Sequence, residues 1–155
     1  MAKTNPPPPL PVTPPPPVKI APEPVQAPPA EEMEPDADPY DIIFAKAELK
    51  WARGFYPWAK KLYCQLLDWD DQPRLSIVYF RLGHIAQYHE KKLGDAASLY
   101  WKSLEIWPNS AAPYNNLGVI AIRQGNLKDA KAYLSRALDI DPYLAVTHGN
   151  LAWLA

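Results

Sequence analysis

The chain has 155 residues and a formal net charge of −1, with 16 Lys and Arg against 17 Asp and Glu. This charge balance excludes a strongly basic nucleic-acid binder, and no apolar run approaches the roughly 18 residues that a membrane helix needs. The single cysteine, Cys64, excludes an internal disulfide and a cysteine-based zinc site. The first residues lack the apolar core of a secretory signal, so we expect a cytoplasmic protein.

Residues 1–39 differ in composition from the rest of the chain. They hold fifteen of the twenty prolines and a net charge of −4, whereas residues 40–155 carry +3. Runs of proline fix φ and remove backbone donors, and few apolar residues accompany them. We therefore predict a disordered proline-rich tail that ends in an acidic stretch, residues 31–38. The tail is either a spacer or a ligand, because residues 8–11 (PPLP) have the P-x-x-P form that polyproline-recognising domains bind.

The body that begins at residue 40 shows a helical pattern. Leu, Ala, Tyr and Trp recur at spacings of three and four, and no stretch alternates apolar and polar residues as a strand does. Gly54, Gly94 and Gly125 each stand where a periodic segment stops, as expected for a glycine just after a helix. Prolines mark other boundaries. The seven helices predicted for this all-α body span residues 40–53, 57–68, 75–91, 95–106, 111–124, 127–140 and 144–155.

The body also repeats itself. An aromatic, a Leu-Gly pair, an alanine and a closing proline recur in two successive copies. The spacing between matching residues is 35 early in the copy and 34 later, so we place one extra residue in the turn of the earlier copy, around residues 91–94. The matching residues are Tyr79, Leu82, Gly83, Ala96 and Pro108 in one copy and Tyr114, Leu117, Gly118, Ala130 and Pro142 in the next.

This pattern resembles the tetratricopeptide repeat (TPR), a helix-turn-helix unit of 34 residues with these signature positions. The resemblance implies a right-handed α-solenoid, because one unit cannot bury its apolar face alone and successive units must stack. Small residues such as Gly83 and Gly118 would let the two helices of a unit approach closely. The resemblance covers residues 40–155, as units 40–74, 76–110 and 111–144 and a partial unit 145–155.

The resemblance also implies a function. TPR domains bind extended peptides in a concave groove lined by the first helix of each unit, so we expect a non-catalytic interaction scaffold, adaptor or assembly factor. Asn116 and Asn150 match the asparagine ladder with which family members grip a peptide backbone, and Arg81 takes the preceding place. The candidate groove residues are Phe80, Arg81, His84, Tyr88, Asn115, Asn116, Val119, Arg123, Asn150 and Trp153.

Two other kinds of site are not expected. The family's carboxylate clamp for chaperone C-termini needs several Lys and Arg around an asparagine, whereas at the matching positions here only Arg81 supplies positive charge. A groove with aromatic anchors instead favours an apolar or aromatic peptide. We expect no metal, no cofactor and no enzyme activity. His84 and His89 are five residues apart and do not share a helix face as helical zinc ligands do. Cys64 lies mid-helix without a basic cluster, so we expect a small packed residue and not a nucleophile.

Three further hypotheses concern the surface of the body. Six tryptophans are too many for the core of a small solenoid, and residues 144–155 are apolar where a solenoid usually ends in a polar capping helix. We expect either that the natural protein continues beyond this apolar end or that a partner or a second copy covers it. The chain is alternatively a structural subunit of a larger complex, including a membrane-associated one. In a third hypothesis, the acidic stretch 31–38 folds back over the basic body and regulates the groove.

Overall fold

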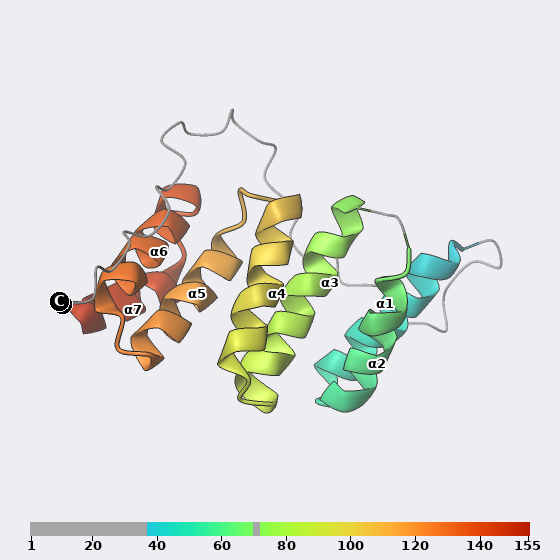
Figure 1. Cartoon of the computed structure of the whole chain (residues 1–155). Helices are drawn as coiled ribbons and strands as arrows, with labels where there is room; N and C mark the ends of the chain where they lie inside the picture. Colours follow the sequence, from blue (N-terminus) through green and yellow to red (C-terminus); the bar gives the residue numbers. More distant parts are fainter. Residues whose placement is uncertain (1–36, 70–71) are drawn as a thin grey trace, which may run out of the picture.

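The computed structural model describes residues 37–69 and 72–155, so the predictions for the tail up to residue 36 lie outside the described residues. The described part consists of helices joined by short turns and has no strand, as predicted. Figure 1 shows the helices side by side in chain order, from α1 at one end to α7 at the other. They are α1 (Pro39–Ala52), α2 (Tyr56–Leu66), α3 (Gln72–His84), the π-helical segment η1 (Ile85–His89), α4 (Leu93–Ile106), α5 (Ala111–Arg123), α6 (Leu127–Ile140) and α7 (Ala145–Leu154).

The helices pack in consecutive pairs. The most extensive contacts join α1 to α2, α3 to α4 and α5 to α6, while α2–α3, α4–α5 and α6–α7 contacts link one pair to the next. Each pair buries apolar residues against its neighbour, which is how a solenoid of short units acquires a continuous core. The predicted α-solenoid of TPR helix pairs is confirmed.

Two glycines allow the close approach of helices within a pair. A Cβ atom placed on Gly83 would lie 2.7 Å from Cε1 of Tyr100, and one on Gly118 would lie 2.7 Å from Cδ2 of Leu134. Tyr100 and Leu134 are fully buried on the second helix of each pair. The prediction that these glycines let the helices approach is therefore confirmed.

Helix ends follow from local chemistry. Asp38 caps α1 by accepting a hydrogen bond from the Tyr40 N–H at 2.9 Å, and Asn126 caps α6 by accepting one from the Asp129 N–H. Gly54 and Gly125 have φ values of +78° and +76°, the left-handed conformation predicted for glycines that end a helix. α3 begins at residue 72 and not at the expected 75, since proline at position 73 is tolerated in the first turn of a helix.

The prediction for Gly94 is wrong. Gly94 lies in the first turn of α4, and the left-handed residue of this unit is Lys91, with φ +60°. The Lys92 N–H bonds the Ala86 carbonyl at 2.8 Å, whereas in the next unit the Asn126 N–H bonds the Ala121 carbonyl at 2.9 Å. The first of these bonds spans one residue more than the second. The extra residue therefore lies between Ala86 and Lys91, where η1 widens the helix, and not around residues 91–94.

Trp58, Trp101 and Cys64 are all partly or largely exposed. Trp101 packs edge-on against Tyr114 and Tyr133 at the seam between pairs, with ring centroids 6.3 and 5.9 Å apart, whereas Trp58 is 61% exposed. Trp101 therefore lies at a seam between pairs, and Trp58 lies on the surface. Cys64 is exposed on α2, so the prediction of a packed cysteine is wrong. The burial that remains raises the pKa of its thiol.

Among the described helices, none combines the length and the apolar character needed to cross a membrane.

Candidate peptide-binding face

The candidate residues lie on the first helices of successive pairs. We call the surface formed by α1, α3 with η1, α5 and α7 the first-helix face. Phe80, Arg81 and His84 lie on α3 and Tyr88 on η1, whereas Asn115, Asn116, Val119 and Arg123 lie on α5 and Asn150 and Trp153 on α7.

Arg81 is engaged by a partner within the chain. Its Nε and Nη2 donate to the two carboxylate oxygens of Glu48 on α1, at 3.0 and 2.8 Å, and both side chains are more than four-fifths buried. Tyr63 on α2 donates its hydroxyl hydrogen to the same carboxylate, and burial together with this bond raises the Tyr63 pKa. Glu48 therefore neutralises the Arg81 charge inside the fold, and this ion pair joins the first pair of helices to the second.

Asn116 is likewise held by hydrogen bonds between repeats. Its Nδ2 donates to the Tyr100 hydroxyl at 3.0 Å, and that hydroxyl donates to Oε1 of Gln87 at 2.7 Å. Asn116 is 7% exposed and Gln87 is fully buried. Burial is the main cause that raises the Tyr100 pKa, so this hydroxyl stays protonated and available as a donor.

Asn115 extends the same network to the last helix. Its Nδ2 donates to Oδ1 of Asn116 at 3.2 Å, and its own Oδ1 accepts from Thr147 Oγ1 and from Asn150 Nδ2, both at 3.0 Å. In the structure, the asparagines expected to grip a peptide thus bond one another across α4, α5 and α7. A peptide would have to displace these bonds to use the asparagine amides.

A second cluster, on α3, η1 and the adjoining ends of α1 and α2, consists of stacked rings, and we call it the aromatic belt. It begins on α1 and α2, where two rings pack edge-on with centroids 5.4 Å apart, and it continues over α3 and η1. His84 lies at its centre, 4.8 Å from Trp51 and 4.5 Å from Tyr88, while His89 stacks on Tyr56 at 3.5 Å. The belt comprises Trp51, Tyr56, His84, Tyr88 and His89.

Arginines flank the belt at both ends. The Arg81 guanidinium lies 4.8 Å from the Trp51 ring, and that of Arg123 lies 5.7 Å from the Tyr88 ring, both within cation–π range. Burial, helped by the electrostatic effects of His89 and Arg81, lowers the pKa of His84 to about 4. His84 is therefore neutral near pH 7, and its Nδ1 is buried with no hydrogen-bond partner among the described residues.

Only part of the predicted set lies at the belt. His84 and Tyr88 belong to it, and Arg81 and Arg123 lie beside it. Phe80 instead packs on the Tyr100 ring with centroids 5.8 Å apart, and Trp153 is 68% exposed on α7. The predicted set lacks Trp51, Tyr56 and His89. Trp51 stands at a groove position of the first unit. His89 is brought onto Tyr56 by η1, which repeat alignment alone does not reveal.

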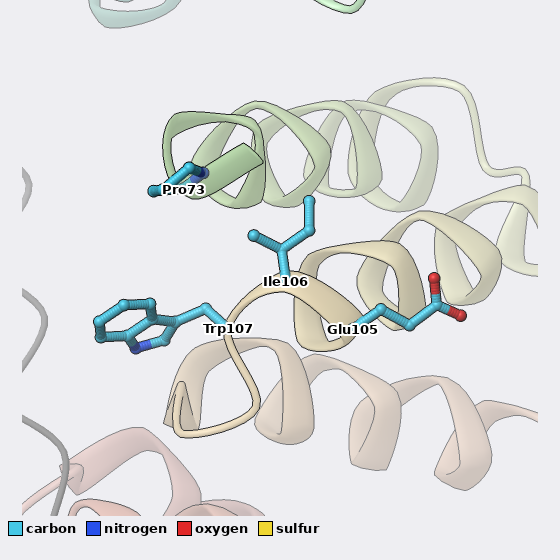
Figure 2. A pocket seen from close by; sticks show the side chains of 4 residues that line it. All are labelled: Pro73, Glu105, Ile106 and Trp107. Carbon is cyan, nitrogen blue, oxygen red and sulfur yellow. The ribbon is translucent and has the colours of Figure 1, made fainter. Parts of the chain in front are cut away.

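Two hollows lie outside the belt. One, of about 400 Å³, is shown in Figure 2, where Ile106 points toward Pro73 on α3 while Trp107 and Glu105 point to opposite sides. The other, of about 390 Å³, lies between α1 and α2, and we call it the lysine hollow. It is lined by Lys46, Lys50, Trp58, Lys61, Leu62 and Gln65.

The described residues contain no group of three or more His, Cys, Asp and Glu side chains placed to hold a metal ion. His84 and His89, with ring centroids 6.2 Å apart, are instead parts of the aromatic belt. The belt itself offers stacking and cation–π contacts.

Comparison with known proteins identifies one repeat of the chain. Residues 111–144 match the family model of the tetratricopeptide repeat. Human tetratricopeptide repeat protein 8 is 29% identical over 89 residues, which are 56% of this chain and only 16% of that relative's length.

Solved TPR domains share the fold at low identity. The first TPR domain of Spaghetti (RPAP3), bound to the HSP90 peptide SRMEEVD, superposes with a TM-score of 0.66 at 17% identity, covering 74% of this chain and 89% of that one. The Yersinia enterocolitica secretion chaperone SycD, in complex with a peptide of the translocator YopD, gives a TM-score of 0.68 at 16% identity, covering 79% and 96%. Residues 111–144 therefore carry a tetratricopeptide repeat, within a chain that shares the fold of solved TPR domains.

Proposed function

We propose that this chain is a non-catalytic interaction scaffold that binds an extended peptide segment of a partner protein on its first-helix face. The observation that carries the proposal is the aromatic belt, where half-buried rings lie together between two arginines. Aromatic and arginine side chains dominate the energetics of protein interfaces. The two structural neighbours described above hold peptides on the same fold, which supports this mode of binding.

The hydrogen bonds of the face indicate what kind of peptide it favours. Arg81 and Asn116 are engaged within the fold, whereas Arg123 is exposed and forms no ion pair within the part of the chain that the structure describes. We infer that the peptide inserts an apolar or aromatic side chain beside Tyr88 and places a carboxylate near Arg123. Asn150 and Trp153 extend the proposed face toward α7.

A selection from random peptides tests this proposal. The full chain is used to select binders from a phage-displayed library, and the Kd of each selected peptide is then measured by fluorescence anisotropy. Tyr88→Ala is expected to raise Kd about tenfold, since truncating an interface anchor costs more than about 1 kcal/mol. The matched control is Tyr143→Ala, which removes a tyrosine that is 92% exposed before α7. Equal Kd values for the two variants would contradict the proposal.

A second candidate function is a structural subunit of a larger complex. The observation that favours it is the apolar surface of α7, where Val146 and Trp153 are 55% and 68% exposed. In that case Trp153→Ala would release the chain from its native complex in sedimentation, while Tyr88→Ala would not. The opposite pattern would favour the peptide scaffold.

A further inference from the structure

The lysine hollow between α1 and α2 presents positive charge without matching carboxylates. Lys46, Lys50 and Lys61 line it, and none of them forms an ion pair within the described ranges. By contrast, Lys60, the neighbour of Lys61 on α2, pairs with Glu90. The apolar part of the hollow is the Trp58 indole, which is 61% exposed.

The hollow is separate from the proposed peptide face. On α1 its two lysines lie two residues to either side of Glu48, which points to Arg81 and Tyr63. Two residues turn a helix by about 200°, so the lysines lie on the opposite side of α1 from Glu48. A ligand in the hollow would therefore not occupy the aromatic belt.

We propose that the lysine hollow holds the acidic stretch of this chain's own tail, residues 31–36. This stretch, EEMEPD, places four carboxylates around Met33, and its negative charge is complementary to the positive charge of the hollow. Met33 offers an apolar thioether for the Trp58 ring, a favourable sulfur–aromatic pairing. Tethering raises the effective concentration of the stretch, so weak contacts suffice for occupancy.

The lengths of the segments are compatible. Asp38 is fixed at the start of α1, where it caps the helix and pairs with Arg74 at 3.3 Å. Lys46 and Lys50 lie about 12 and 18 Å along α1 from Asp38. An extended chain reaches about 3.3 Å per residue, so Glu34 can reach about 13 Å from Asp38 and Glu31 about 23 Å. The acidic residues thus have the reach to meet both lysines.

Paramagnetic relaxation enhancement in the full chain tests the proposal. A spin label is attached to Ala30→Cys in a Cys64→Ser background, and the indole N–H signals of the tryptophans are recorded. The Trp58 signal, identified with Trp58→Phe, is expected to lose most of its intensity. The Trp153 signal at the far end of the solenoid is expected to keep it.

Charge variants decide the interpretation. With E31Q, E32Q and E34Q together, or with K46Q, K50Q and K61Q together, the Trp58 signal is expected to regain its intensity. Unchanged broadening in both triple variants would overturn the proposal, as would the absence of broadening in the parent. A mixture of spin-labelled chain at natural isotopic abundance with ¹⁵N-labelled chain tests for a second copy. Broadening in that mixture would show that a second copy occupies the hollow, and would also overturn the proposal.

Discussion

Replacing Gly83 with alanine tests the close packing between the two helices of a unit. A Cβ atom at this position would lie 2.7 Å from Cε1 and 2.9 Å from Cδ1 of Tyr100. Comfortable carbon–carbon contacts are about 3.5 to 4.0 Å, so the ring or the helix would have to move by about 1 Å. The Tyr100 ring is fully buried, and its hydroxyl bonds Gln87 and Asn116, so this movement strains the polar network as well.

The expected size of the effect follows from these contacts. Overpacking of a core costs about 1 to 3 kcal/mol. Alanine in place of a helical glycine returns about 0.5 to 1 kcal/mol. Because the displaced ring also loses hydrogen bonds, we expect Gly83→Ala to lower the free energy of unfolding by about 1 to 3 kcal/mol in total.

Urea denaturation followed by far-UV circular dichroism measures the change. The matched control is Gly149→Ala, another helical glycine, where a Cβ meets no atom within 4 Å. The control is expected to gain up to about 1 kcal/mol from helix propensity. If Gly83→Ala were as stable as Gly149→Ala, the helices of the unit would not approach as described and the reasoning would be refuted.

Three further predictions concern other features. Lys91→Gly is expected to raise the free energy of unfolding by about 0.5 to 1 kcal/mol in urea denaturation, because Lys91 has φ +60°; a loss of stability would contradict this. In an NMR titration His84 is expected to protonate near pH 4, and not near 6.5, because burial lowers its pKa. Since the unfolded histidine binds its proton at higher pH, stability should fall as pH drops from 6.5 to 4. The HSP90 peptide SRMEEVD is expected to show no saturable binding in calorimetry, because Glu48 engages Arg81; binding abolished by Arg81→Ala would refute this.

The sequence predicts the repeat architecture closely where local and periodic signals agree. The helix expected over residues 127–140 matches α6 in its bounds, because Asn126 caps its start and Pro142 follows its end. The repeat positions of Gly83 and Gly118 predict points of close approach, and the structure places large side chains against both glycines.

The position of the inserted residue could not be predicted in the same way. The alignment shows only that spacing changes between Ala86 and Ala96, and a glycine within that interval, Gly94, is the natural residue for a turn. The structure instead absorbs the residue in η1 and gives the left-handed conformation to Lys91. Backbone hydrogen bonding decides where the extra residue is accommodated, and the residue types in this interval do not indicate that position.

Repeat positions also do not predict which partner each polar side chain bonds. Arg81 and Asn116 stand at repeat positions where the resemblance implies peptide contacts, yet their partners Glu48 and Tyr100 come from other helices at long sequence separation. Such pairings depend on side-chain directions that a periodic pattern does not specify.

The most direct test of peptide binding on the first-helix face is to map a selected peptide on the full chain by NMR chemical-shift perturbation. The largest shifts are expected on the belt residues His84 and Tyr88 and on Arg123, with small shifts in the lysine hollow. Largest shifts at Trp58, with the belt unchanged, would contradict the claim that the first-helix face binds the peptide.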